Sequence, residues 1–297
     1  MMNRDAFSTC HPAVNFIFFV GAIGLGVVIS HPAYLLVGIA AASAYYLALN
    51  GVKGLKRIAA LLPLFVLLTV INPLFNTQGN TVLFLLFGRP YTLEALLYGS
   101  AIAGIFVVMT LWFGCYNQVL TGDKFTSLFG NVLPVLSLLL VMVLRMIPNL
   151  IRKGQQITGA RKSIGKGSND QSPYMEKVND GMTVLSALTS WALEGGVITG
   201  DSMRSRGYGC GKRTSFQLYS MTGRDRVLII LMVPLLTIVL ITIITGGTAA
   251  AFTPDLQIAP VKGPHVWGLV AYGAYLSIPI VLQMKEAVQW RISRSRI

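Results

Sequence analysis

Long apolar stretches alternate along the chain with shorter segments that hold most of the polar residues. Apart from Glu94 at the start of the fourth stretch, none of six such stretches contains Lys, Arg, Asp or Glu. About 20 apolar residues in a helix are long enough to cross the hydrocarbon core of a bilayer. The pattern therefore predicts six membrane spans, at residues 14–29, 33–49, 58–75, 93–113, 227–245 and 266–284.

The first stretch is short, and two interpretations fit it. It is either a span that forms a tight helical hairpin with the second stretch, through Ser-His-Pro at 30–32, or the apolar core of a signal peptide. A signal peptide needs a small-residue cleavage site, and no clear one lies before the second stretch. We therefore expect a span.

A seventh apolar segment, "VLPVLSLLLVMVLRMI" at 132–147, is not counted as a span. It contains Pro134, Ser137 and Arg145, and a crossing here would move the basic run at 152–177 to the other side of the membrane. We interpret it as a helix that lies at the inner membrane surface or packs beneath the spans.

Composition and charge support a membrane protein. Hydrophobic residues make up 54% of the chain and charged residues 12%, whereas soluble proteins average about 25% charged. With the N-terminus in the cytoplasm, 22 of the 24 Lys and Arg residues fall in the predicted cytoplasmic segments 1–13, 50–57, 114–226 and 285–297. This asymmetry follows the positive-inside rule and explains the net charge of +13 without nucleic acid. Both termini are expected in the cytoplasm.

The spans divide the chain into three regions: four spans in 1–116, a cytoplasmic region in 117–226, and two spans with a basic tail in 227–297. Apolar periodicity within the cytoplasmic region predicts two long helices, over 132–162 and 179–206. The residues between them, "IGKGSNDQSPYMEK" at 164–177, are typical of a connector. The predicted fold class is therefore all-α, a polytopic membrane protein with about six spans and a cytoplasmic insert of long helices.

Both predicted helices end with arginine followed by glycine. The first ends at Ala160-Arg161-Lys162-Ser163 before Gly165, and the second at Ser205-Arg206-Gly207. Basic residues at a helix C-terminus favour the helix by about 0.3–1 kcal/mol through the macrodipole, which would be a purely structural role. Alternatively, an arginine on a rigid helix end suits docking to a partner, because its planar guanidinium makes bidentate contacts to carboxylates.

Several motifs resemble one known family, and together they extend over nearly the whole chain. They are "HPAVNF" (11–16), "NPLFNTQG" (72–79), "GRPYTLEALLYG" (88–99), "LRMIP" (144–148) and "SMRSRGYG" (202–209). These residues resemble the T component of energy-coupling factor transporters, the EcfT/CbiQ family. In that family two cytoplasmic coupling helices carry Ala-Arg-Gly or Ala-Arg-Ser signatures, which match 160–162 and 205–207. Lys162 and Ser205 depart from the signatures.

The resemblance implies a scaffold in the cytoplasmic membrane of a prokaryote that takes up a vitamin or a transition metal. Two ABC-type ATPase subunits would bind the signatures (Ala160, Arg161, Ser205, Arg206 and Gly207), and the coupling helices would pass their movement to a small substrate-binding membrane subunit. The face implied for that subunit consists of Leu136, Leu140, Leu144, Leu185, Leu188 and Trp191.

The chain shows no sign of its own catalytic, cofactor or metal site. "GCGKRT" at 209–214 departs from the phosphate-binding loop pattern, so a separate ATPase is expected. No ionisable residue lies at the centre of a span, which disfavours an ion-coupled carrier. Two alternatives remain: a conventional ABC permease subunit with its own substrate pathway, and a membrane-embedded enzyme.

Overall fold

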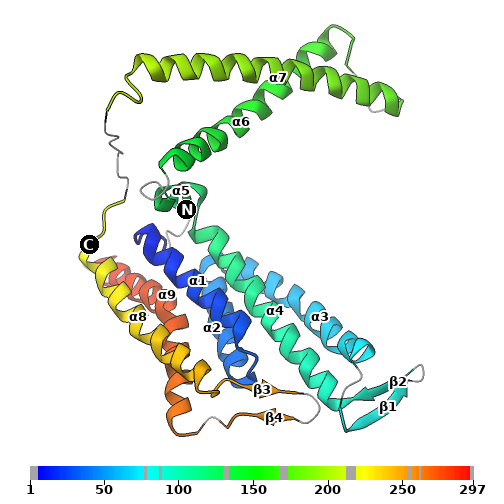
Figure 1. Cartoon of the computed structure of the whole chain (residues 1–297), viewed down its shortest axis with the longest axis vertical. Helices are drawn as coiled ribbons and strands as arrows, with labels where there is room; N and C mark the ends of the chain where they lie inside the picture. The colour runs from blue at the N-terminus through cyan, green and yellow to red at the C-terminus, as the bar shows by residue number, and fades with distance from the viewer. Residues whose placement is uncertain are drawn as a thin grey trace. The chain divides into compact units, whose positions relative to one another are not determined.

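The computed structural model describes residues 6–76, 79–86, 89–129, 134–167, 173–211, 219–252, 256–260 and 262–294. The chain divides into two compact units (Figure 1). One, the membrane unit, consists of residues 1–124 and 219–297; the other, the paired-helix unit, consists of residues 125–218.

Helices make up nearly all of the membrane unit. They are α1 (Pro12–Val28), α2 (Pro32–Asn50), α3 (Val52–Phe75), α4 (Leu93–Val119), α8 (Gly223–Ile244) and α9 (Pro264–Arg294), and a short helix α5 (Gly122–Phe129) begins at its edge. Two small antiparallel hairpins complete it: β1 (Val82–Leu86) with β2 (Arg89–Thr92), and β3 (Ala250–Ala251) with β4 (Gln257–Ile258). The predicted cytoplasmic region begins at residue 117 and ends at residue 226. In the structure these two residues lie inside α4 and α8, because both helices continue beyond their apolar stretches.

The prediction of a helical membrane protein with about six spans is confirmed, although the six long apolar helices are not the six predicted stretches. Five coincide: α2, α3, α4, α8 and α9. The first predicted span is α1, an apolar helix of 17 residues that falls short of the others in length. The sixth long apolar helix is Val135–Ser163 of the paired-helix unit, which contains residues 135–147 of the segment interpreted as a surface helix. Residues 132 and 133 of that segment lie outside the described residues.

The same short motif starts the first two helices. His11 and His31 each precede a proline, and each ring Nδ1 accepts the backbone N–H two residues later at 3.2 Å. The proline has no N–H to satisfy, and its fixed φ suits the first helical position. α1 ends at Val28 and α2 begins at Pro32, so the short connection predicted between them is confirmed. The packing of α1 is mainly against α4 and α8.

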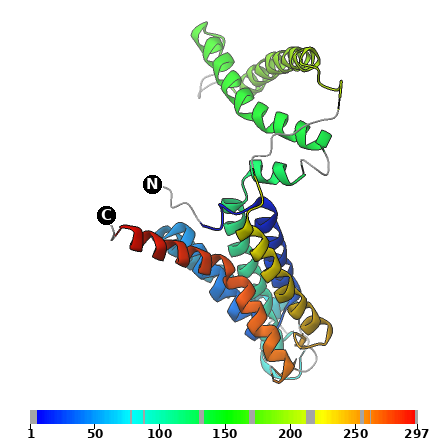
Figure 2. The same cartoon turned by 90° about the vertical axis from the view of Figure 1, so that its left-hand side faces the viewer.

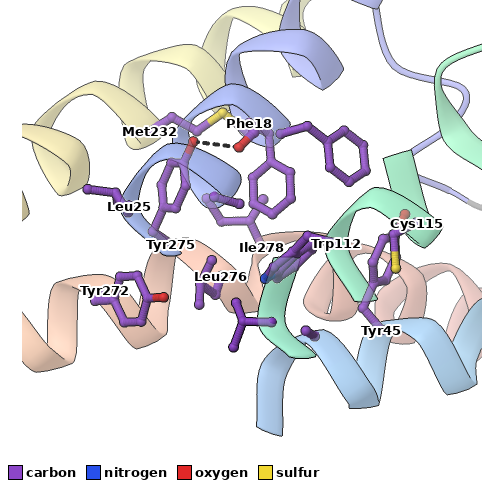
Figure 3. Close-up of a cluster of buried hydrophobic side chains, with 14 of the residues drawn as sticks. Phe18, Leu25, Tyr45, Trp112, Cys115, Met232, Tyr272, Tyr275, Leu276 and Ile278 are labelled. Atoms are coloured by element: carbon purple, nitrogen blue, oxygen red, sulfur yellow. Dashed lines mark hydrogen bonds between the residues drawn. The ribbon is translucent and has the colours of Figure 1, made fainter. Parts of the chain in front are cut away.

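An aromatic cluster forms the core of the membrane unit (Figure 3). Phe18 stacks on Tyr275 with ring centroids 5.2 Å apart and meets Trp112 edge-on at 5.5 Å. The Tyr275 hydroxyl donates to the Phe18 carbonyl at 3.0 Å, which satisfies a buried polar group. Gly21 has no side chain to obstruct this approach, since a Cβ there would collide with the Tyr275 hydroxyl. The core therefore joins α1, α4 and α9.

The outer surface of the membrane unit is apolar. On α3 only Gly54 and Pro73 are buried, and leucines and valines such as Leu62 and Val66 are exposed. Exposed apolar area on this scale suits a lipid environment rather than water.

The paired-helix unit contains two long helices that contact each other, α6 (Pro134–Ser163) and α7 (Tyr174–Ser205). α7 begins five residues before the expected 179, so the end of the expected connector, residues 174–177, is helical. No described residue from 135 to 211 is buried.

Candidate docking site on the paired helices

Both helices of the pair end in the same hydrogen-bonded turn. At α6, Lys166 N–H donates to the Arg161 carbonyl and Gly165 N–H to the Lys162 carbonyl. At α7, Tyr208 N–H donates to the Met203 carbonyl and Gly207 N–H to the Arg204 carbonyl. Each pair of bonds is a Schellman motif around a left-handed glycine, with φ +70° at Gly165 and +78° at Gly207. The expectation of glycine C-caps is confirmed.

The two predicted arginines occupy different positions in this shared motif. Arg206 is the C-cap residue, immediately before the left-handed glycine. Arg161 lies three residues earlier than the equivalent position, which is Ile164, one residue before Gly165. Three residues are almost a full turn of helix along the axis, so the side chains leave their helix ends at different heights. The two signatures are therefore similar in sequence but not in placement.

Arg161 is engaged within the paired-helix unit. Its Nε lies 2.6 Å from Oδ1 of Asp180 on α7, and its Nη2 donates to the Lys166 carbonyl at 3.3 Å. The Arg161 side chain is 23% exposed and the Asp180 side chain 11% exposed. A guanidinium has five N–H donors, so these contacts leave other donors of Arg161 available. The ion pair joins the end of α6 to the second turn of α7.

Arg206 is exposed, and no described residue lies within hydrogen-bonding distance of its side chain. Its backbone N–H bonds back to the Ser202 carbonyl at 3.3 Å and fixes the last turn. Ser205 is also turned to the backbone, since its hydroxyl donates to Ser202 at 3.0 Å. With Gly207 fixing the turn, Arg206 is a cation presented on a rigid helix end.

The six residues expected on the face for a membrane partner separate into two groups. Leu136, Leu144 and Leu185 are exposed, and Leu140 is half-buried. Leu188 and Trp191 instead lie toward α6: the Leu188 side chain is 3.5 Å from where a Cβ on Gly154 would be.

Trp191 is held against α6 by a cation. The Lys153 ammonium lies 5.8 Å from the centre of the Trp191 ring, within the range of a cation–π contact. Leu188 and Trp191 therefore hold the helix pair together, whereas the exposed leucines leave an apolar surface open.

Sequence reasoning missed two polar contacts within the membrane unit. The buried Lys124 ammonium, where the chain leaves this unit, donates to the carbonyls of Ser8 and Val119, the latter at 2.8 Å. After the chain has returned, Asp225 accepts the His11 N–H at 3.1 Å and completes a capping box with Thr222. The N-terminal turn thus contacts the membrane unit close to both points where the chain crosses its boundary. Thr-x-x-Asp at 222–225 was the available sequence signal.

Asp180 was also missed as the partner of Arg161. The chain has only 11 acidic residues. Asp180 lies at the start of the second predicted helix, so the sequence could have suggested it as a partner for Arg161 at the end of the first. Among the described residues no group of three or more His, Cys, Asp and Glu side chains could hold a metal ion.

The sequence model of one protein family, CbiQ, described as cobalt transport protein, matches residues 5–217 of the chain. The match includes α1 to α4 and both helices of the pair. No curated protein matches the chain.

Proposed function

The chain belongs to the CbiQ family of cobalt transport proteins, and we propose that it is the energy-coupling scaffold of an ECF-type ABC importer. In this proposal α6 and α7 are the coupling helices, and two ABC-type ATPase subunits dock at their ends. A small substrate-binding subunit sits in the membrane beside the scaffold. The cargo is a transition metal or a vitamin, chosen by that subunit.

The observation that supports the proposal most strongly is the state of Arg206. A rigid C-cap presents its guanidinium to solvent, with no partner among the residues that the structure describes. A structural charge at a helix end would serve equally well as lysine and could lie anywhere in the last turn. The left-handed glycine fixes the backbone at the cap, so Arg206 is offered from a defined place to a groove lined by carboxylates or carbonyls.

Arg161 takes a second, weaker role in docking. Asp180 binds its Nε edge and thereby orients the remaining guanidinium donors outward. The ATPase that meets α6 would contact an arginine that is already half-engaged, so reversal of its charge affects both docking and the α6–α7 pair.

The openness of the paired-helix unit also favours a coupling role. The exposed Leu136, Leu144 and Leu185 give it an apolar surface that water does not stabilise, and an apolar surface of this kind suits a membrane partner. The distribution of Lys and Arg supports a cytoplasmic placement for the insert and for both termini.

A pull-down tests the proposal. The chain is co-expressed with its candidate ATPases, solubilised in mild detergent, and compared as wild type, Arg206→Glu and Arg161→Glu. Arg204→Glu is the matched control, since Arg204 is also exposed and lies two residues earlier on α7. We expect Arg206→Glu to lose the ATPases, Arg161→Glu to retain fewer, and Arg204→Glu to retain them. Equal recovery of the ATPases with Arg206→Glu and Arg204→Glu would contradict docking at Arg206 and leave it only a role as a charge at the helix end.

A further inference from the structure

A cavity lies between the first turn of α8 and the C-terminal part of α9. Its volume is about 470 Å³. In Figure 2 the C-terminal part of α9 (red) runs away from the start of α8 (yellow). Pro279 lies in the middle of α9. Proline removes a helical hydrogen bond and commonly bends a helix. The lining residues are Gly223, Arg224, Val227, Leu228, Leu282, Lys285, Glu286 and Gln289.

The lining combines cations with an apolar wall. Arg224 and Lys285 are exposed, Glu286 is half-buried, and Gln289 adds an amide. Val227 and Leu282 supply apolar surface on the two sides of the same cavity. A ligand that fits must carry an anion next to a hydrophobic portion.

The place of the cavity on the helices points to a lipid. Just beyond it on α8, Ile230 and Leu231 are exposed, and on α9 Val281 is exposed. These side chains belong to apolar helices long enough to span a membrane, so the cavity lies where the apolar surface gives way to charge. Basic pockets between helices at the cytoplasmic side are suited to anionic lipid headgroups.

We propose that this cavity binds an anionic glycerophospholipid of the phosphatidylglycerol type. Its phosphate lies between Arg224 and Lys285, and its acyl chains follow Val227 and Leu282 into the membrane. The headgroup hydroxyls donate to Glu286 and Gln289, whose carboxylate and amide oxygens accept hydrogen bonds. The lining holds two cations and one carboxylate, so its net positive charge favours a lipid with a net negative charge.

The proposal depends on the scaffold proposal only for the orientation that places these helix ends in the inner leaflet. ATPase docking at Arg206 plays no part in it. The two can therefore fail separately: lipid binding is measured on the chain alone, and docking by pull-down.

Native mass spectrometry of the purified full chain tests the site. Protein extracted from bilayers of equimolar phosphatidylglycerol and phosphatidylethanolamine is compared as wild type and as the double variant Arg224→Gln/Lys285→Gln. We expect wild type to retain phosphatidylglycerol, and the double variant to retain on the order of tenfold less. Arg226→Gln is the matched control, because Arg226 is exposed on the same turn of α8 and does not line the cavity.

Two further arms distinguish the remaining outcomes. The exchange variant Arg224→Lys/Lys285→Arg keeps both charges, so its retention of the lipid shows that the glutamine variant lost binding rather than folding. Soluble glycerol phosphate is added as a competitor, and displacement of the lipid by it would identify a site for a free anion and overturn the proposal. Equal retention of both lipids, or equal loss in Arg226→Gln, would overturn it as well.

Discussion

The membrane unit and the paired-helix unit are both helical and rich in aliphatic residues, but they differ in whether their side chains are buried. The membrane unit buries an aromatic core in which Phe7, Phe18 and Trp112 have no exposed surface. The paired-helix unit buries none of its described residues from 135 to 211. Because a helix depends mostly on the packing of its apolar face, the second unit is incomplete by itself. In the scaffold proposal, the partner subunits would cover this open apolar surface.

The two arginines repeat this contrast on a smaller scale. Arg161 is satisfied by Asp180 within the pair, whereas Arg206 is presented to solvent at its helix cap. Similar signatures in the sequence therefore have different surroundings, and Arg161 lies three residues before its own cap, whereas Arg206 is the cap residue.

The largest stability effect is expected in the closed core. In Gly21→Ala the new methyl group meets the Tyr275 hydroxyl and lies 3.2 Å from Leu236. We expect a loss of about 1–3 kcal/mol, as for other overpacked sites. Gly24→Ala is the control on the same helix, because no atom lies within 4 Å of its new Cβ. Thermal unfolding in detergent measures both, and an equally stable Gly21→Ala would contradict the packing described for Tyr275.

The next effect is expected at the buried Lys124 ammonium of the membrane unit. In Lys124→Met the carbonyls of Ser8 and Val119 lose a buried donor. Leaving buried groups unsatisfied costs about 1–3 kcal/mol, and we expect α5 and the N-terminal turn to exchange amide hydrogens faster. Lys53→Met, at an exposed position on α3, is the control. Unchanged exchange in Lys124→Met would mean that the Lys124 ammonium does not hold the N-terminal turn in place.

Within the open pair, two leucines one turn apart should respond differently. Leu188→Gln removes a contact with α6 at Gly154 and should weaken the pair by about 1 kcal/mol. Leu185→Gln changes a side chain that is 56% exposed, so its effect should stay within about 0.5 kcal/mol. Hydrogen exchange of α6 and α7 in the full chain compares them. Similar effects at both positions would remove the distinction between the packed and the open face.

The smallest effect is expected at the ion pair. Both members are partly exposed, so breaking it by Asp180→Asn should cost about 0.2–1 kcal/mol, read by a double-mutant cycle with Arg161→Gln. The charge swap Arg161→Asp/Asp180→Arg should restore the pairing of α6 with α7 without restoring an arginine on α6. Full ATPase recovery with this swap would exclude Arg161 from docking.

Local signals in the sequence predicted much of the fold. Apolar length located five long spans, and glycines 165 and 207 located the ends of the paired helices. The length of an apolar stretch alone could not show which of α1 and α6 contributes to the buried core. The shorter α1 supplies Phe18 and Phe19 to the buried core, whereas the longer α6 buries nothing, and burial depends on the three-dimensional neighbours of a helix.

The candidate site was predictable only in part. Arg206 and Gly207 stand together in the sequence, so their cap geometry followed from local rules. The pairing of Arg161 with Asp180 requires knowledge of how α6 crosses α7. For the same reason the sequence could not show that Leu188 lies beside Gly154 and Trp191 beside Lys153 of α6. Their place on a partner face stays a prediction.

One natural side chain allows the most direct test of docking at the end of α7. Cys210 is exposed in the turn after Arg206, whereas Cys10 and Cys115 are buried. A maleimide photo-cross-linker will therefore label Cys210 in the purified complex with its ATPases. The account predicts a covalent adduct between this chain and an ATPase subunit that disappears in Arg206→Glu and persists in Arg204→Glu. A complex that stays intact yet gives no ATPase adduct from Cys210 would contradict docking at this helix end.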